Sequence, residues 1–192
     1  MNNLLHIITP LYRFDYLEQV YNSILMNDDI RWHISISNRR NDFNFKNIIS
    51  DKRVNLYVVD CEDTDATSKR KAILSKIKDG YFCFLDDDTI FHENMYIKYL
   101  ECKENNFRGM LVGEQLDNKG ELRLIASPPR YGRIDTGNVI AHSGCLSACK
   151  WPDKYEPGKN AKDFLFWESV YKFYNEKCAI WNQPISHYNK LR

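Results

Sequence analysis

The feature of this sequence that most constrains the fold is an apolar run that ends in three carboxylates. Residues 81–85 are aromatic or aliphatic apart from one cysteine, and Asp86, Asp87 and Asp88 follow at once. A strand that is apolar on both faces belongs in the middle of a parallel sheet. Three adjacent carboxylates repel one another, which raises the pKa of at least one of them unless a cation is near. We therefore predict a central strand whose carboxyl end forms an acidic site.

The rest of the chain predicts an α/β domain. Short β-branched or aromatic runs alternate with helical patterns, which is typical of βαβ units. Strands are predicted at 4–9, 32–37, 54–59 and 81–85, and helices at 16–26, from Thr64 or Asp65 to Gly80, at 94–104 and at 163–174. Asp15 and Glu18 form a capping pattern for the first helix. Residues 110–113 and 121–126 predict a small antiparallel hairpin, and 151–162 a mobile loop.

Composition excludes several classes of protein. The 192 residues are 43% hydrophobic and carry 27 basic and 26 acidic side chains, so one soluble domain over 1–192 is expected, with no strong field for nucleic acid. No apolar run approaches the roughly 18 residues of a transmembrane segment. The six cysteines form no CxxC pair and predict reduced thiols in a cytoplasmic protein. Cys145, Cys149 and His142 have a poor spacing for zinc and lack a fourth ligand.

The acidic turn has two interpretations. Oxygen ligands at a strand end favour Mg²⁺ or Mn²⁺, which take few protein carboxylates and fill their other positions with water and phosphate. Ligands also bind at strand ends in open α/β sheets. In the alternative, the turn only caps the next helix through Asp88 or Thr89.

Several motifs, in order, resemble the nucleotide-sugar glycosyltransferases of the GT-A fold, especially the large inverting family 2. They are Thr9-Pro10-Leu11-Tyr12-Arg13 after the first strand, Asn38 after the second, Phe84-Leu85-Asp86-Asp87-Asp88, and Lys162-Asp163-Phe164-Leu165-Phe166-Trp167. The opening motif and the triple Asp are also similar to animal glucuronyltransferases, and the compact chain is similar to glycosyltransferase domains of large algal viruses. The resemblance implies a nucleotide-binding half at about 1–104, an acceptor-binding half at about 105–192 and, if the chain is viral, a location in the host cytoplasm.

For the nucleotide, the resemblance implies a wall around the base made by Thr9, Pro10 and Tyr12, with Arg13 near the base or phosphates. Asn38 replaces an Asp that commonly holds the base, and Asp60 could supply the missing acceptor for a uracil N–H. The Lys69-Arg70-Lys71 run lies where the family has an Arg near the nucleotide, and Lys71 matches best. A solvated helix face is the alternative for any of the three.

For the reaction, the resemblance assigns Asp86 to the ribose and Asp88 to the metal, with Asp87 in a supporting position among the nucleotide-binding residues. The metal stabilises the charge that develops on the leaving diphosphate. Asp163 matches the family's general base, which removes the proton of the acceptor hydroxyl during one inverting displacement. A helix cap is the alternative for Asp163. Glu168 lies about 140° further around the helix and is the poorer candidate.

The remaining candidates concern the sugar and the metal. Asp135 and Asn138 resemble a segment under the donor sugar or at the acceptor site, with a simple turn as the alternative. Trp151, Tyr155 and Trp167 could stack on sugars or could be core residues. His187 lies where several GT-A enzymes place a histidine that reaches the metal or the diphosphate.

Taken together, these residues predict a metal-dependent, inverting glycosyltransferase that uses Mn²⁺ or Mg²⁺. It would move a sugar from a nucleotide-diphosphate sugar, with a UDP-sugar as the expected donor, to a hydroxyl of a glycan or glycoconjugate. The enzymatic alternative is a nucleotidyltransferase acting on sugar phosphates, although its glycine-rich phosphate loop is missing after the first strand. The other alternative is a non-catalytic carbohydrate- or protein-binding module on the same fold.

Overall fold

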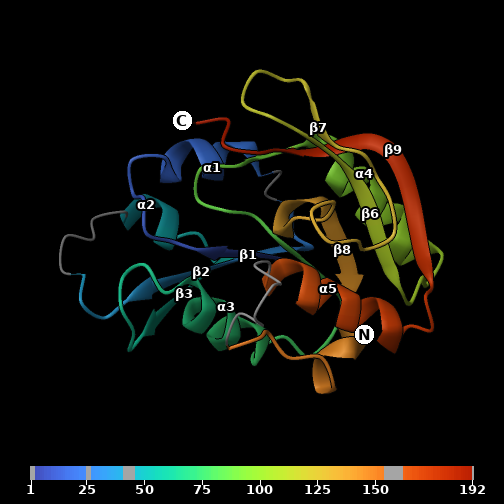
Figure 1. Ribbon diagram of the computed structural model, residues 1–192. Coiled ribbons are helices and arrows are strands. Elements are labelled where there is room, and N and C mark those ends of the chain that lie inside the picture. Colours follow the sequence, from blue (N-terminus) through green and yellow to red (C-terminus); the bar gives the residue numbers. More distant parts are fainter. Residues whose placement is uncertain (1–2, 25–26, 41–45, 154–161, 192) are drawn as a thin grey trace.

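The computed structural model describes residues 3–24, 27–40, 46–153 and 162–191, and a mixed β-sheet forms its centre (Figure 1). Along the sheet the strands follow the order β3-β2-β1-β4-β8-β6-β9-β5, and β7 pairs with β6 at one side. The strands are β1 (Leu5–Pro10), β2 (Ile30–Ser37), β3 (Val54–Val59), β4 (Tyr81–Phe84), β5 (Ile90–Phe91), β6 (Met110–Leu116), β7 (Leu122–Leu124), β8 (Val139–His142) and β9 (Cys178–His187).

The strand directions bring distant segments of the chain to one edge of the sheet. β1 pairs in parallel with β2 and β4, and β2 in parallel with β3. β8 runs antiparallel to β4, so the residues that precede β8 lie at the same edge as those that follow β4. β6 is antiparallel to β8, and β9 is parallel to β6. The end of β9 therefore lies at this edge as well.

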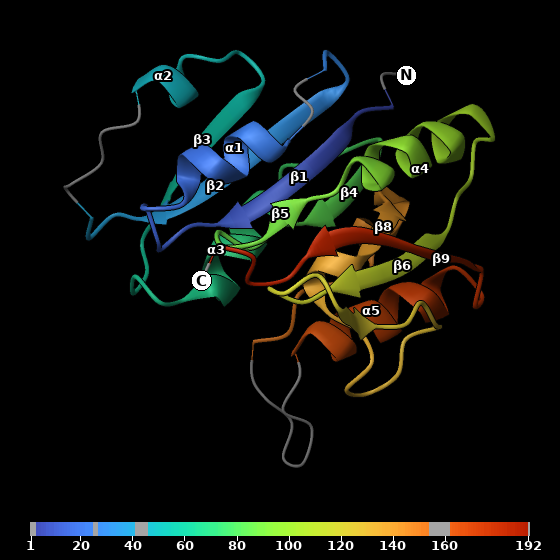
Figure 2. The same ribbon diagram turned by 90° about the horizontal axis from the view of Figure 1, so that it is seen from above.

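Helices cover both faces of the sheet. One hydrophobic cluster joins Leu5, Ile7, Tyr81 and Cys83 to α1 (Leu17–Ser23) and α4 (Glu93–Glu104). The other joins the alternate strand residues to α3 (Ala66–Leu74) and α5 (Lys162–Phe173). Figure 2 shows α1 and α4 on one side of the strands and α5 on the other. A short α2 (Lys46–Ile49) lies before β3, and two 3₁₀ turns, η1 (Thr136–Asn138) and η2 (Ser143–Ser147), flank β8.

The central strand is buried on both faces, as the sequence predicts. All four residues of β4 are buried, and its side chains alternate between the two clusters. The hairpin of β6 and β7 is also confirmed. The α/β architecture is therefore as expected, with parallel pairing around β1 and mixed pairing beyond β4.

Two local predictions differ from the structure, and two strands were not predicted. Asp15 and Glu18 do not form a capping box, because Tyr16 is the N-cap of α1 and no side chain caps it. Asp65 caps α3 as expected, but the helix ends at Leu74 and not at Gly80. The short β5 and the ten-residue β9 were not predicted. Most of the predicted 151–162 loop lies outside the described residues.

Gly80 is required where the chain enters β4. Its φ is +77°, and a Cβ at this position would lie 2.3 Å from the carbonyl oxygen of Leu4, which is main chain and cannot swing away. We expect Gly80→Ala to lower the free energy of unfolding by about 2–4 kcal/mol, from strain and clash together. Gly120→Ala is a matched control, because Gly120 has a φ of +88° and nothing within 4 Å of its Cβ position. It should cost only about 1–2 kcal/mol. Equal losses in urea denaturation would contradict this account.

Candidate functional site

The candidate site lies at the edge of the sheet where β1, β2, β3 and β4 end and where η1 leads into β8. The three aspartates follow β4 directly, since Leu85 still donates its backbone N–H to Ile8 of β1 at 2.9 Å. In this structure Asp86, Asp87 and Asp88 have different partners and different exposure. They are therefore described one by one.

Asp87 is a fully buried brace for the loop after β1. Its Oδ2 accepts the backbone N–H groups of Tyr12 and Arg13, both at 2.8 Å, and its Oδ1 accepts from Arg13 Nε at 2.7 Å. The side chain has no exposed surface. Asp87 thus holds Tyr12 and Arg13 in place and has no surface to offer a ligand. Its support of a nucleotide through this loop stays a prediction.

Asp86 is the aspartate that faces a cation on α3. Arg70 Nη2 lies 2.8 Å from Asp86 Oδ1, and the Arg70 guanidinium also stacks on Phe84 and Trp151. Burial raises the pKa of Asp86, and the neighbouring Arg70 opposes that shift. Lys71, the predicted residue of the basic run, instead forms an ion pair with Asp153. Arg70 is thus the residue of the basic run that the helix directs at the acidic turn, and a contact of Lys71 with a nucleotide stays a prediction.

Asp88 is almost fully buried and lies 3.0 Å from the guanidinium of Arg13. Burial raises its pKa to about 6, even though Arg13 acts in the opposite direction. Arg13 therefore joins Asp87 and Asp88 through one guanidinium, and it also stacks on the Tyr12 ring at 4.5 Å. Two arginines, Arg13 and Arg70, offset part of the charge of the three carboxylates in this structure.

Lys69 fixes the loop after β1 from below, a role that sequence reasoning missed. Its side chain is fully buried, and its ammonium donates to the Leu11 carbonyl at 2.7 Å and lies 3.6 Å from the Asp63 carboxylate. Arg40 joins the same loop by donating to the Tyr12 carbonyl at 3.1 Å and pairing with Asp63. A buried lysine is rare without such partners. The sequence gives no sign of this burial, because Lys69 stands in a run of three basic residues that looks exposed.

Thr9 and Pro10 do not form a wall that a base could touch. Both are buried within β1, and the Thr9 hydroxyl accepts the indole N–H of Trp32 at 2.8 Å. Their predicted contact with the nucleotide is corrected to a role beneath the loop. Tyr12 is only partly buried and remains at the surface of the site.

Asn38 and Asp60 lie together at the ends of β2 and β3. Asn38 Nδ2 donates to Asp60 Oδ1 at 2.9 Å, and this pair is exposed. Ser37 holds the strand end by donating to the Cys61 carbonyl. The structure thus joins the two residues that the sequence suggested for a nucleobase, and both present a free edge of hydrogen-bonding atoms to solvent.

Asp163 enters the site from the first turn of α5. Burial raises its pKa to about 6, and Arg70 opposes the shift while Asp135 and Asp86 add to it. These interactions place Asp163 within electrostatic reach of the acidic turn and of the η1 turn. A carboxyl with this pKa is ionised at neutral pH and still basic enough to take a proton, which suits a general base.

At the η1 turn, Asp135 lies in the candidate site and Asn138 does not. Asp135 accepts the backbone N–H of Gly137 at 3.0 Å and lies 3.2 Å from Arg123 Nη1. Asn138 is fully buried, accepts the Asp135 N–H and donates to the Gly113 carbonyl. The predicted contact of Asn138 with a sugar is therefore corrected to a capping role inside the fold. Arg123, which sequence reasoning missed, lies next to Asp135.

His187 ends β9 and is paired with Ile90, two residues beyond Asp88. Its ring stacks on His92 with centroids 5.5 Å apart, and burial lowers its pKa. In the part of the chain that the structure describes, no three His, Cys, Asp or Glu side chains are grouped so that they could hold a metal ion. Whatever role His187 has toward a metal stays a prediction.

The aromatic candidates are mainly core residues. Trp167 is fully buried and stacks on Phe82 with centroids 5.8 Å apart, so its predicted contact with a sugar is corrected to core packing. Trp151 is also buried, with Arg70 against its ring. Tyr155 lies outside the described residues. A sugar platform cannot be told from a core aromatic by residue type alone.

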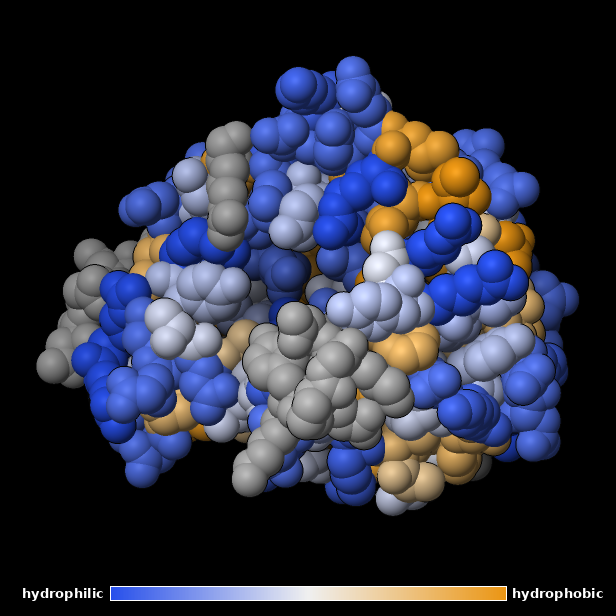
Figure 3. All heavy atoms as spheres, in the orientation of Figure 1, coloured by the Kyte–Doolittle hydropathy of each residue, from blue (hydrophilic) through white to orange (hydrophobic). Residues whose placement is uncertain are grey.

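The surface of the molecule is hollowed near the middle of the face seen in Figure 1, and hydrophilic residues border the hollow (Figure 3).

All six cysteines are free thiols. Among the described helices, none is long and apolar enough to cross a lipid bilayer.

Comparison with solved structures identifies the fold. TarS 1-349 from S. aureus superimposes with a TM-score of 0.68 at 15% identity, and its complexes with UDP-GlcNAc and with UDP give TM-scores of 0.67 and 0.68. The match covers 96% of this chain and 58–60% of those chains. The chain thus spans less than two thirds of the structures it matches, and it shares with them a GT-A-like Rossmann fold. Neither a protein-family model nor a curated protein sequence matches it.

Proposed function

We propose that this chain is a glycosyltransferase that moves a sugar from a nucleoside-diphosphate sugar, in the first place a UDP-sugar, to a hydroxyl of a glycan or glycoconjugate. The observation that carries the proposal is the ion pair of Arg70 and Asp86 at one sheet edge, with Asp163 within electrostatic reach of both. The fold supports it, because structures that share this fold hold UDP-GlcNAc and UDP. The same edge of an open α/β sheet is where ligands of this kind bind.

In the proposed complex, the base lies against Tyr12 and the exposed pair of Asn38 and Asp60. A uracil ring offers one N–H donor and two carbonyl acceptors. Asp60 would accept the N–H, and the Asn38 amide would donate to a carbonyl. Asp87, Lys69 and Arg40 hold the Tyr12 loop in place, so that little ordering is left to be done when the nucleotide binds.

The diphosphate would lie over the acidic turn, near Arg70 and Arg13. Asp86 supplies carboxylate oxygens that are partly exposed, a donor type that fits Mg²⁺ or Mn²⁺. Asp88, which is almost fully buried against Arg13, would join it only if Arg13 moved. No third protein ligand joins them among the described residues, so a cation there would be completed by phosphate oxygens and water. When bound, it supplies positive charge for the leaving diphosphate. Arg70 adds a protein cation for the same charge and holds Asp86 in place.

Asp163 is proposed as the general base. The acceptor oxygen attacks the anomeric carbon while Asp163 takes the proton of that hydroxyl, and the bond from the anomeric carbon to the phosphate oxygen breaks. The electron pair of that bond leaves with the diphosphate, and one such displacement inverts the configuration. The raised pKa of Asp163, about 6, supports this role. Asp135, held by Arg123, is within electrostatic reach of Asp163 and would face the sugar hydroxyls.

A titration with UDP tests the donor half of the proposal. We expect UDP to bind the wild-type protein in the presence of Mn²⁺, and Arg70→Gln to weaken the affinity about tenfold or more, since a charged hydrogen bond to phosphate is lost. Lys71→Gln is the matched control, with the same loss of charge one residue along α3, and should change the affinity less than about twofold. Calorimetry measures both, with and without a chelator.

The proposal fails at its donor half if UDP, GDP, dTDP and CMP all leave the wild-type protein without a binding signal. Equal weakening in the Arg70 and Lys71 variants would show instead that the nucleotide senses only the general charge of α3.

A further inference from the structure

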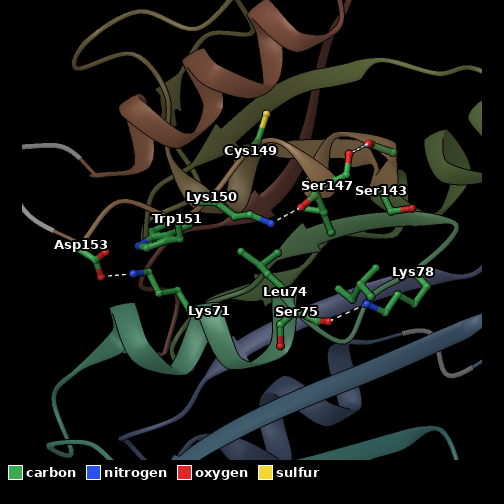
Figure 4. Close-up of a pocket in the computed structure, with 13 residues that line it drawn as sticks. Lys71, Leu74, Ser75, Lys78, Ser143, Ser147, Cys149, Lys150, Trp151 and Asp153 are labelled. Atoms are coloured by element: carbon green, nitrogen blue, oxygen red, sulfur yellow. Dashed lines mark hydrogen bonds and ion pairs between the residues drawn. The ribbon is translucent and has the colours of Figure 1, made fainter.

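A cavity lies between α3 and the segment that runs from η2 to Asp153 (Figure 4). Its volume is about 640 Å³, which falls in the range of small-molecule sites. The three aspartates of the acidic turn, Asp163 and the Asn38–Asp60 pair are not among its lining residues. The cavity is thus separate from the site proposed for the donor, although Trp151 contacts Arg70 and also forms part of the cavity wall.

Lysines enter this cavity from both walls. Lys71 and Lys78 come from α3 and the turn after it, and Lys150 comes from the opposite segment (Figure 4). Lys71 is paired with Asp153, the one carboxylate among the described lining residues. Lys78 and Lys150 donate to the carbonyl oxygens of Ser75 at 3.2 Å and Leu146 at 2.9 Å. An ammonium has three N–H donors, so both retain donors and a positive charge that no described carboxylate neutralises.

The floor of the cavity is apolar and holds an unused hydrogen-bond donor. Leu74, Leu146 and Trp151 are buried there. The indole Nε1 of Trp151, a residue only 2% exposed, has no hydrogen-bond partner among the described residues. A buried N–H normally has an acceptor, because leaving it unpaired costs about 1–3 kcal/mol. In Figure 4 the nitrogen of Trp151 is directed to the side where Lys71 and Asp153 meet, so an acceptor oxygen at that end would satisfy it.

We propose that this cavity binds a small molecule that carries a phosphate group on an apolar body. The phosphate would accept from the Trp151 indole and from the neighbouring Lys150, with Lys78 adding positive charge at the other end of the cavity (Figure 4). The apolar body would cover Leu74 and Leu146. Lysine is a point charge that suits a phosphate dianion without fixed geometry. The proposal goes beyond the glycosyl transfer proposed above and does not depend on it. A lipid phosphate has both parts, whereas a soluble sugar phosphate shares only the phosphate group.

The test is a calorimetric titration of the unmodified protein, without nucleotide, with three probes: dihexanoyl phosphatidate, glucose 6-phosphate and inorganic phosphate. We expect at least one of them to bind saturably, with a dissociation constant at or below about 1 mM. Stronger binding of the phosphatidate would support a phosphate on an apolar body, and stronger binding of glucose 6-phosphate would overturn the apolar half of the proposal. The absence of saturable binding by all three overturns the proposal.

Variants locate the bound probe. The double variant Lys78→Gln, Lys150→Gln should weaken binding about tenfold or more, and Trp151→Phe, which removes only the N–H, should weaken it several-fold. The matched control is Lys76→Gln, Lys119→Gln, which removes the same charge from two exposed lysines outside the cavity. Equal weakening in the two double variants overturns the proposal.

Competition with UDP separates this proposal from the proposed function. The Lys78, Lys150 variant should bind UDP as the wild-type protein does, and saturating UDP should leave the probe affinity unchanged. If UDP displaced the probe, the cavity would not be a separate site. If the protein bound the probe but no nucleotide, the proposed function would fail and this inference would stand.

Discussion

Asp163→Asn is expected to reduce sugar transfer about 10²–10⁴-fold while making the protein more stable at pH 7.5. The rate falls because an amide cannot take the proton of the acceptor hydroxyl. UDP binding should persist, since the Asn side chain still fills the space at the first turn of α5 and leaves the Arg70–Asp86 pair intact. A glycosyl-transfer assay and a UDP titration on the same preparation measure the two effects.

The stability gain follows from the pKa of Asp163, which burial raises from 3.8 to about 6. The folded chain holds a proton on this carboxyl that the unfolded chain has already lost between about pH 4 and pH 6. The contribution of Asp163 to stability therefore falls as the pH rises through that window and stays unfavourable above it. Asparagine carries no charge to bury, so the variant should gain about 1–3 kcal/mol at pH 7.5, or several degrees in Tm. Below about pH 4 the difference should vanish.

Glu168→Gln is the matched control for this prediction. Glu168 lies on the same helix, is partly exposed and pairs with Lys172 at 3.2 Å. We expect nearly full activity and little change in stability from it.

Wild-type activity should also rise with pH up to about 6 and then level off. The pKa of Asp88 is also about 6, so the pH profile of the activity does not by itself identify the titrating residue. The Asp163→Asn variant makes that assignment. Near-full activity of Asp163→Asn would refute the base assignment.

The central strand and its acidic turn could be predicted because their signal is local. An apolar run followed by three carboxylates fixes a strand, its burial and its carboxyl end together. The topology then determines which other residues lie near the turn, because parallel strands bring Arg13, Asn38 and Asp60 to the same edge of the sheet as Asp86. Residues that end neighbouring parallel strands are therefore the easiest part of such a site to place.

Which face of α3 is directed at the acidic turn could not be predicted in the same way. Lys69 and Ile73 share one face at a spacing of four residues, and both are buried. That fact turns Arg70 toward the acidic turn and Lys71 away from it. The run of three basic residues does not reveal which face this is, because Lys69 is buried by its contacts with Leu11 and Asp63 and these arise only in the folded chain.

β9 was missed for a related reason. It contains Asn182, Gln183 and Pro184, residues that usually argue against a strand. Its pairing with β6 shifts register between Gly113 and Gln115, and this irregularity accommodates the proline. Tertiary pairing here overrides local preference. The burial of Asn138 and Trp167 could not be foreseen either, since both residue types serve equally well at a sugar site and in a core.

Asp87→Asn is expected to have the largest effect on stability of any single change in the acidic turn. Asp87 has no exposed surface, and its two oxygens accept two backbone N–H groups and the guanidinium of Arg13. An amide would turn one acceptor into a donor that faces other donors and would leave Arg13 with less compensation. Breaking a buried ion pair in this way costs about 3–5 kcal/mol, which corresponds to a fall in Tm of roughly 6–20 °C for a chain of this size.

Asp86→Asn provides the contrast, because Asp86 is partly exposed and has a single arginine partner at 2.8 Å. We expect it to cost no more than about 1–2 kcal/mol in urea denaturation while weakening UDP binding. The two neighbouring aspartates would then separate stability from binding: Asp87 holds the Tyr12 loop to the sheet, and Asp86 faces the ligand. Equal losses of stability in the two variants would mean that the acidic turn acts as a single charged unit, in which case the loop depends on the total charge of the turn and not on the hydrogen bonds of Asp87.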